Sequence, residues 1–213
     1  MNRRTVLAGM GAGMIASTAG CMEIITGDTI EYTANGAHVP ESVSEETGYA
    51  FVDTHEITVD ETVDVLGISR QVIANNIQTE YEKTVSVDPL GSVPAAAFSI
   101  IATPSVSILG QEFNPVADMS TEEIASLVED NYDGMGELAY QETNSQDVGG
   151  ESVDVSTYLV EASLEGTPVE LELVISEAVD FDEDLVLAVG AYPTVTPEEQ
   201  DNIETLMAAI EPQ

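Results

Sequence analysis

Apolar residues alternate with polar residues along much of this chain, with the period of two that is typical of β-strands. The clearest run spans residues 57–65, where β-branched residues occupy odd positions and polar residues mostly separate them: Ile57, Val59, Val63 and Val65. A strand with this pattern turns one face toward a core and the other toward solvent. We therefore expect a half-buried strand here.

The segment that follows predicts the partner of this strand. Leu66-Gly67 is typical of a tight turn, and residues 68–87 carry β-branched residues and Tyr81 among polar ones. Together the two runs predict a long antiparallel hairpin. Asn75-Asn76 indicates a bulge or a break in its second strand.

Other segments also have the composition of strands. Residues 95–109 are mostly apolar and are interrupted at Thr103-Pro104, which fits a strand with a proline kink or an edge position. The residues around Asp147-Val148-Gly149-Gly150 predict a turn between two more strands. The remaining predicted strands are residues 29–33, 138–141, 153–163, 167–176 and 185–192.

Three segments predict helices. Ser120 can cap a helix that ends near Asn131, and Glu123 follows three residues later as in a capping box. Residues 41–46 predict one or two helical turns before Gly48. A last helix begins at Thr196-Pro197-Glu198-Glu199, with proline in its first turn, and carries apolar residues on one face: Ile203, Leu206, Met207 and Ile210.

Strands in hairpin order combined with amphipathic helices predict an α+β fold, in which an antiparallel β-sheet is packed by two or more helices. A chain of 213 residues is long enough for one sizeable core and too short for two large domains. We expect a single α+β domain over residues 29–213.

The charge of the chain is extreme, because 40 acidic residues face 4 basic ones and the formal net charge is −36. Hydrophobic residues nevertheless make up 43% of the chain, which favours a folded protein over an acidic disordered one. A surface of this kind suits molar salt, where screening over about 3 Å suppresses self-repulsion. Nucleic acid is excluded as a partner, since so few cations cannot neutralise many phosphates.

The N-terminal segment has the layout of an export signal. Residues 1–20 contain Arg3-Arg4, then an apolar and glycine-rich run, then small residues before Cys21. The pair of arginines resembles a twin-arginine export signal. Thr18-Ala19-Gly20-Cys21 resembles a lipobox, which implies that a glycerol-linked lipid is attached to Cys21, although threonine replaces the usual leucine. Residues 1–20 are thus the predicted signal peptide, and residues 21–28 the lipidated N-terminus and short tether.

Over nearly its whole length the chain resembles a family of uncharacterised haloarchaeal lipoproteins. The resemblance implies a location, the outer face of the cell membrane, and no activity. It is carried by the signal through Cys21, by Glu46-Thr47-Gly48-Tyr49, by residues 99–115 with Thr103-Pro104 and Gly110-Gln111-Glu112-Phe113-Asn114-Pro115, and by the final strand and helix.

The second half is similar in the order of its elements to the PsbP-like fold, with a helix, a meandering sheet and a C-terminal helix after a Pro-Glu-Glu start. Members of that fold are mostly non-enzymatic binding or assembly factors. A fold does not fix a function, so the resemblance implies a binding or assembly role only as an expectation.

Candidate metal and cofactor chemistry is weak throughout. His38 and His55 lack metal-ligand spacing. Asp180, Asp182 and Asp184 alternate as at the start of a calcium loop, but Leu185 replaces the required glycine, which favours a solvated acidic turn with at most weak cation binding. We predict no metal site and no cofactor, and no catalytic residue can be assigned.

Arg70 and Lys83 are the only cations outside the N-terminal segment, and each faces the other's strand in the proposed hairpin. A rare cation in an acidic chain could bind an anionic ligand. The alternative, which we favour, is a cross-strand salt bridge with Glu80 or Glu82.

These observations lead to two functional hypotheses. The first is a membrane-anchored extracellular lipoprotein of a halophilic archaeon that binds a small ligand or an envelope protein without catalysis, its membrane partner being lipid through Cys21. The second is a secreted hydrolase whose acid and base are carboxylates. Converging carboxylates in a cleft would favour the hydrolase, and an apolar patch on the sheet would favour the binding domain.

Overall fold

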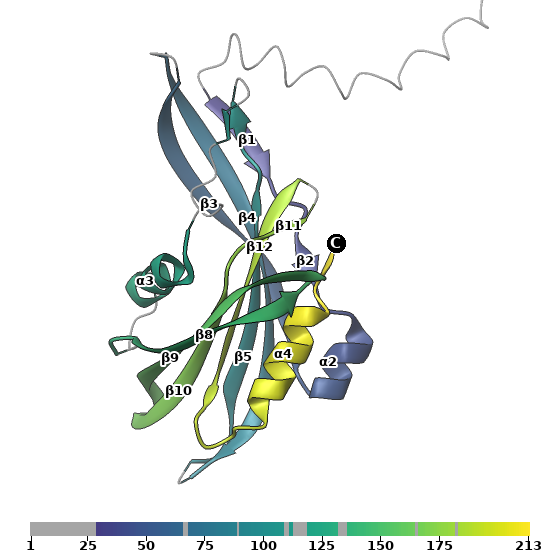
Figure 1. Cartoon of the computed structure of the whole chain (residues 1–213), viewed down its shortest axis with the longest axis vertical. Helices are drawn as coiled ribbons and strands as arrows, with labels where there is room; N and C mark the ends of the chain where they lie inside the picture. Colours follow the sequence, from purple (N-terminus) through teal and green to yellow (C-terminus); the bar gives the residue numbers. More distant parts are fainter. Residues whose placement is uncertain are drawn as a thin grey trace, which may run out of the picture.

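A single long strand, β4 (Ile68–Val87), organises the sheet in this computed structural model. Its residues 68–82 pair with β3 (Ala50–Val65), residues 77–87 with β5 (Gly91–Pro104) and residues 71–75 with β1 (Thr29–Thr33). A strand has only two edges, so β1 and β5 follow one another along the edge opposite β3. The β3–β4 hairpin projects from one end of the molecule (Figure 1), and we call this the hairpin end.

The structure describes residues 29–65, 68–88, 90–108, 111–112, 119–131, 136–164, 166–181 and 183–213. Arg3, Arg4 and Cys21, the predicted turn at Leu66-Gly67 and the Gly110 and Phe113–Pro115 portions of the family motif lie outside these residues.

Among the described residues, nine strands form one sheet. Its pairing is antiparallel except between β1 and β4, which run parallel. The strands β3 and β8 lie at its two ends. Beyond β5 the order continues with β12 (Asp184–Pro193), β10 (Thr167–Ser176), β9 (Glu151–Leu164) and β8 (Ala139–Val148), while β11 (Val179–Phe181) pairs with β12. Two small ladders pair β2 (Ala37–His38) with β13 (Glu211–Pro212) and β6 (Ser107–Ile108) with β7 (Gln111–Glu112).

The predicted fold class is wrong. The described structure is 66% strand and 15% helix, so the molecule is a mostly β protein with a large mixed sheet and few short helices. Two features of the chain explain the difference. The hairpin strands are longer than the sequence pattern predicted, because β3 begins at Ala50. The predicted strand β1 also pairs parallel to β4, an orientation that no local pattern indicates.

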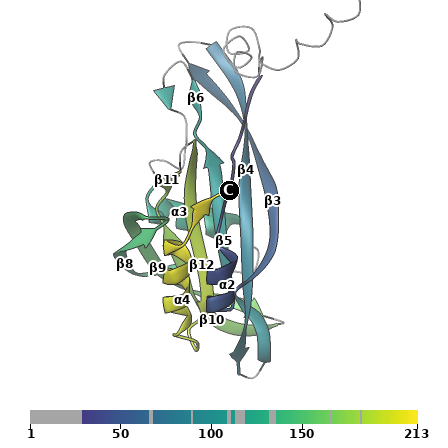
Figure 2. The same cartoon turned by 90° about the vertical axis from the view of Figure 1, so that its right-hand side faces the viewer.

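The described helices α2 (Glu41–Thr47), α3 (Thr121–Asn131) and α4 (Glu199–Ala208) cover only parts of the sheet (Figures 1 and 2). A β-carbon on Gly190 of β12 would lie 2.7 Å from Ile203 of α4, so glycine allows this helix to approach the sheet closely. On α3, Thr121 contacts Ser156 of β9. Across the sheet, Gly190 pairs with Val174 of β10 and Ser156 pairs with the next residue, Ile175. Successive side chains of a strand point to opposite faces, so α3 and α4 lie on opposite faces of the sheet.

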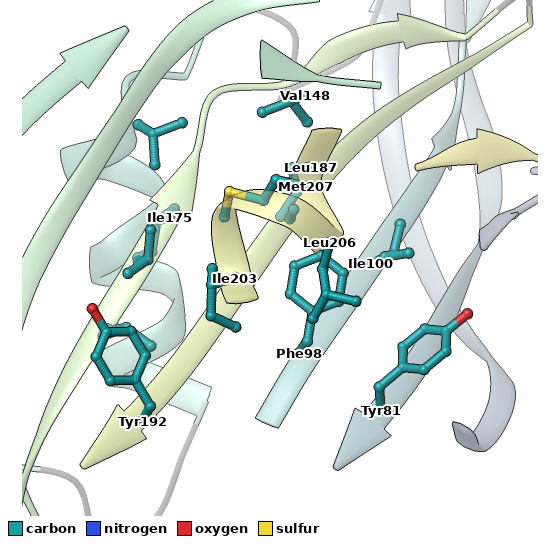
Figure 3. Packing of buried hydrophobic residues seen from close by; sticks show 14 of the residues in the cluster. Tyr81, Phe98, Ile100, Val148, Ile175, Leu187, Tyr192, Ile203, Leu206 and Met207 are labelled. Carbon is teal, nitrogen blue, oxygen red and sulfur yellow. The ribbon is translucent and has the colours of Figure 1, made fainter. Parts of the chain in front are cut away.

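The core beneath α4 confirms the predicted apolar face of the last helix. Ile203, Leu206 and Met207 are at most 1% exposed, and Ile210 is buried just beyond the helix. Figure 3 shows the three helical side chains pointing toward the sheet, near Phe98 and Ile100 of β5. Burying such side chains contributes roughly 1.5–3 kcal/mol each.

Other local predictions are confirmed. The predicted hairpin is β3–β4, with residues 50–65 paired to residues 68–82. The strand predicted at residues 167–176 is β10, and the strand predicted at residues 29–33 is β1. The predicted helical turns form α2, which Gly48 ends with a left-handed φ of 79°.

Three details of the predicted strands are wrong. Ile57 and Val59 do not line a buried face: they are 38% and 39% exposed, and residues 55–60 are exposed on both faces of β3, because the projecting part of the hairpin is not covered by the helices (Figure 1). The register stays continuous through Asn75-Asn76, where the Asn75 amide bonds to Glu31 and Thr33 across the sheet, and the irregularities lie at Phe51/Asp53 and Lys83/Thr84 instead. The strand predicted over residues 95–109 ends at Pro104 without continuing through a kink.

Candidate functional site

A groove runs between α3 and the β8–β9 hairpin, with a volume of about 540 Å³. This size falls within the range of ligand pockets, roughly 300–1,000 Å³. Seven of its ten described lining residues carry a hydroxyl group, and we call it the hydroxyl groove. The lining consists of Ser120, Thr121, Ser126, Tyr140, Thr143, Ser156 and Tyr158, together with Glu122, Ala125 and Leu138.

Four of these hydroxyls form a continuous hydrogen-bonded chain. Thr121 Oγ1 lies 2.6 Å from Ser156 Oγ, which lies 2.6 Å from Thr143 Oγ1, which lies 3.1 Å from the Tyr140 hydroxyl. Three bonds use three of the four hydroxyl hydrogens, so one hydrogen remains for a partner outside the chain. The row crosses three elements, from α3 over β9 to the edge strand β8.

Two tyrosines form the aromatic part of the groove. Tyr140 is 60% exposed, and its ring meets the buried Tyr158 ring edge-on, with centroids 5.8 Å apart and an interplanar angle of 71°. Its hydroxyl is held by Thr143. Tyr140 is therefore held at both the ring and the hydroxyl while much of its surface stays open to solvent. Because the side chain is already fixed, a ligand that binds it loses less affinity to the ordering of this side chain.

The predicted capping box positions the helical wall of the groove. Glu123 accepts hydrogen bonds from the Ser120 backbone N–H and hydroxyl at 2.9 and 3.0 Å, and the Ser120 hydroxyl lies 3.4 Å from the Glu123 N–H. The bonds from Ser120 hold the pKa of the Glu123 carboxyl below its usual value. This confirmed cap fixes the first turn of α3, and with it Thr121 and Glu122.

Among the described residues that line the groove, Glu122 is the single carboxylate. Glycoside chemistry uses two carboxylates on opposite sides of the reacting bond. The hydroxyl groove therefore lacks the arrangement that would have favoured the hydrolase hypothesis.

A second pocket, of about 510 Å³, lies beside α2 and the edge strand β3. Its exposed wall is Phe51, which is 58% exposed and packs edge-on against the buried Tyr81, with ring centroids 6.0 Å apart. The Tyr81 hydroxyl accepts a hydrogen bond from the Val39 N–H, so this ring also fastens the N-terminal segment to β4. Glu41 is the one carboxylate in the described lining of this pocket.

The salt bridge that we favoured for Lys83 has a different partner from the one predicted. Lys83 Nζ lies 2.7 Å from Glu199 Oε1, and the Glu199 side chain is only 2% exposed. The lysine also lies 5.5 Å from the centre of the buried Tyr49 ring. Burial and the neighbouring Glu199 carboxylate raise the pKa of Tyr49. The pair links β4 to α4 across 116 residues, so neighbouring strand carboxylates were the wrong choice.

Arg70 and Lys83 do not come together. Both lie on β4, thirteen residues apart, which at about 3.3 Å per residue separates them by roughly 40 Å. Arg70 pairs in register with Val63 near the hairpin end. An anion site made from both cations is ruled out by this geometry.

The aspartates of the predicted acidic turn also behave differently from expectation. Asp184 is 3% exposed and accepts hydrogen bonds from the Asn35 and Gly36 amides at 2.7 and 3.2 Å, so it fastens the N-terminal segment to β12. Asp180 lies on β11, and Asp182 lies outside the described residues. Within the described part of the chain, no three His, Cys, Asp or Glu residues gather as a metal site would require.

The two histidines lie apart. His38 is half-buried, and its Nε2 lies 3.4 Å from Glu211, whereas His55 is exposed on β3. In the residues that the structure covers, no helix has the length and apolar character needed to cross a membrane.

The hydroxyl groove was missed by sequence reasoning. Its residues come from positions 120–126, 138–143 and 156–158, and serines and threonines on strand faces are ordinary. One signal was available: Tyr140 is the only aromatic residue in the otherwise polar segment of residues 139–148. A single exposed aromatic residue is common on protein surfaces, so this signal alone does not locate the groove.

Two solved structures are similar to this one at low sequence identity. A cyanobacterial PsbP protein (CyanoP) from Synechocystis sp. PCC 6803 is 12% identical, with a TM-score of 0.40 over 84% of this chain and 93% of that chain. A protein of unknown function from Pseudomonas aeruginosa, PA94, is 10% identical, with a TM-score of 0.31 over 72% of this chain and 97% of that chain. No curated protein matches the chain.

The family model described as "Domain of unknown function (DUF6517)" matches residues 36–211. The match begins at Gly36 and ends at Glu211, and so it includes both pockets apart from Gln213 and nearly the whole sheet. The chain therefore belongs to the DUF6517 family.

Proposed function

We propose that this protein is a lipoprotein tethered to the outer face of the membrane of a halophilic archaeon, and that it binds a ligand there without catalysis. The observation that carries the binding role is the hydroxyl groove, which has a fixed and exposed tyrosine, a row of hydroxyls and a single carboxylate in its described lining. Such a lining suits recognition by hydrogen bonds and stacking better than acid–base chemistry.

The position of the first described residue supports the tether. β1 begins with Thr29, at the hairpin end (Figure 1). Cys21 precedes Thr29 by eight residues, which span at most about 28 Å when fully extended. A lipid on Cys21 would therefore keep the hairpin end close to the membrane. Helix α3, which forms one wall of the hydroxyl groove, lies on the body of the molecule, away from that end (Figure 1).

The anchor is tested by intact mass spectrometry of the protein extracted from its native membrane. We expect the mass of residues 21–213 plus a glycerol-linked lipid, and we expect Cys21→Ser to leave the protein unprocessed or released into the medium. A Cys21→Ser variant that is processed and retained like the wild type would refute the anchor.

The binding role is tested on the same extracted protein by native mass spectrometry at gentle ionisation. A small molecule that accompanies the wild type should be lost from Tyr140→Ala and kept by Phe51→Ala. Phe51 is a matched control, because it is the exposed aromatic residue of the opposite edge strand, at 58% exposure against 60% for Tyr140. Equal retention by both variants would remove the groove from the proposal.

Adaptation to salt is tested by dialysis from molar to low salt. With a net charge of −36, loss of screening should lower the melting temperature and reduce the cooperativity of unfolding. A melting curve that is independent of salt would contradict the halophilic origin.

A further inference from the structure

We propose that the ligand of the hydroxyl groove is a neutral carbohydrate unit, which stacks on the exposed Tyr140 ring and hydrogen-bonds to the hydroxyl chain. This inference rests on the proposed function, since it names the class of ligand for the same groove. Three properties of the groove favour this class of ligand: its charge, its hydrogen-bonding groups and its single exposed aromatic ring.

The charge of the groove argues against anionic ligands. Its described lining contains no lysine, arginine or histidine, and it contains Glu122. A carboxylate or phosphate would find no cation to pair with in this lining and would lie close to the Glu122 carboxylate. Phosphorylated and acidic ligands are therefore disfavoured.

The aromatic geometry argues against organic cations. Recognition of a quaternary ammonium group uses several ring faces that enclose the ligand. Here the rings of Tyr140 and Tyr158 are in edge-to-face contact at 5.8 Å and leave no space between them. The groove therefore offers one exposed platform in place of a cage, and in molar salt inorganic cations would compete for Glu122.

The hydrogen-bonding groups match a polyol. A hydroxyl both donates and accepts, so a row of protein hydroxyls can reorient to meet sugar hydroxyls of either polarity. The chain from Thr121 through Ser156 and Thr143 to Tyr140 has one hydrogen left for an outside partner. A sugar also has an apolar C–H face, which can stack on the exposed Tyr140 ring, while Ala125 and Leu138 supply apolar contacts nearby.

Stacking and neutral hydrogen bonds persist in molar salt, the solvent to which the acidic surface is suited. Molar salt screens exposed charges over about 3 Å, but it leaves stacking and hydrogen bonds between neutral groups largely intact. A protein that must bind in concentrated salt gains by recognising its ligand without charge.

The test uses the full-length protein in molar salt with glucose, galactose, mannose and N-acetylglucosamine as probes, and with choline and glucuronate as charged comparators. The chain contains no tryptophan, so Tyr140→Trp places a unique fluorophore in the groove and keeps an aromatic platform. Phe51→Trp is the matched control on the opposite edge strand. At least one neutral sugar should change the emission of Tyr140→Trp in a saturable way and leave that of Phe51→Trp unchanged.

Calorimetric titration of the responding sugar then separates the ring from the hydroxyls. Tyr140→Ala should weaken binding roughly tenfold through loss of stacking. Thr143→Val interrupts the hydroxyl chain and should weaken binding roughly two- to tenfold. Melting curves confirm that each variant is folded, which is expected because Tyr140 is largely exposed.

The two proposals fail in different ways. A response to choline or glucuronate without a response to any neutral sugar would overturn the proposal of a neutral carbohydrate and leave the groove as a binding site. Silence with all six probes, or a sugar response of equal size in Phe51→Trp, would overturn the carbohydrate inference. In that case native mass spectrometry of the extracted protein still decides whether the groove binds anything.

Discussion

Replacing Lys83 with methionine keeps most of the length of the side chain but removes the cation that pairs with Glu199. In the wild type, Lys83 Nζ lies 2.7 Å from Oε1 and 2.9 Å from Oε2 of that carboxylate. After the substitution, the carboxylate keeps a hydrogen bond from Asn202 Nδ2 at 3.0 Å. The Glu199 side chain is 2% exposed and the Lys83 side chain 20%, so little water reaches the carboxylate to replace the lost ammonium.

The expected loss follows from this burial. Removing one partner of a buried ion pair typically costs about 3–5 kcal/mol, because a charge stays behind in a medium of low polarity. For a chain of this size, 1 kcal/mol shifts the melting temperature by about 2–4 °C, so Lys83→Met should melt roughly 6–20 °C below the wild type. Salt should rescue little of this loss, since ions do not penetrate between buried groups.

The assay is thermal unfolding of the full-length protein in molar salt, with a double variant and a surface control. Lys83→Met/Glu199→Met removes both charges and should recover much of the stability that Lys83→Met loses. Glu211→Gln breaks the partly exposed pair with His38 and should change stability by about 1 kcal/mol or less. Two results would refute this account of the pair: a free energy of unfolding of Lys83→Met within about 1 kcal/mol of the wild type, or a double variant that is no more stable than Lys83→Met.

Three further changes test other parts of the structure. Gly190→Ala should destabilise the protein by about 1–3 kcal/mol in thermal melts, because its new methyl group would overlap the buried Ile203 side chain, and a neutral result would mean that α4 can shift. Asp184→Ala should cost roughly 1.5–3 kcal/mol and speed hydrogen exchange at the Gly36 amide that it anchors, while unchanged exchange would contradict this anchor. Hydrogen bonds from Ser120 lower the pKa of Glu123 in the folded protein. The stability that the cap contributes should therefore be complete above the pKa that Glu123 has in the unfolded chain, and should be lost as the pH falls through the lower pKa of the folded protein. Melting temperatures of the wild type and Glu123→Gln should therefore differ at neutral pH and converge in acid; a difference that persists in acid would contradict the cap.

Much of the local structure could be predicted because its causes are local. The capping box of Ser120 and Glu123 joins two residues three positions apart, and both its hydrogen bonds and the helix that it starts are found as predicted. The same holds for the buried stripe of the last helix, since residues with a helical period face one side whatever they pack against.

The pairing of elements was decided by the tertiary structure. A period of two predicts a strand, but it does not say that β1 runs parallel to β4 or that β3 lies at the edge, where Ile57 is exposed. The partner of Lys83 lies 116 residues away, and nothing near Lys83 in the sequence distinguishes Glu199 from closer carboxylates.

The candidate site was decided in the same way. Sequence alone predicts the export signal and the lipid on Cys21, because enzymes that process such signals read a short linear segment. The hydroxyl groove forms only because α3, β8 and β9 come together in the fold. Their packing places the hydroxyls of Thr121, Tyr140 and Ser156 in one hydrogen-bonded row. Each hydroxyl is unremarkable in its own segment, and only the packing of a helix against the edge of the sheet places them in one row.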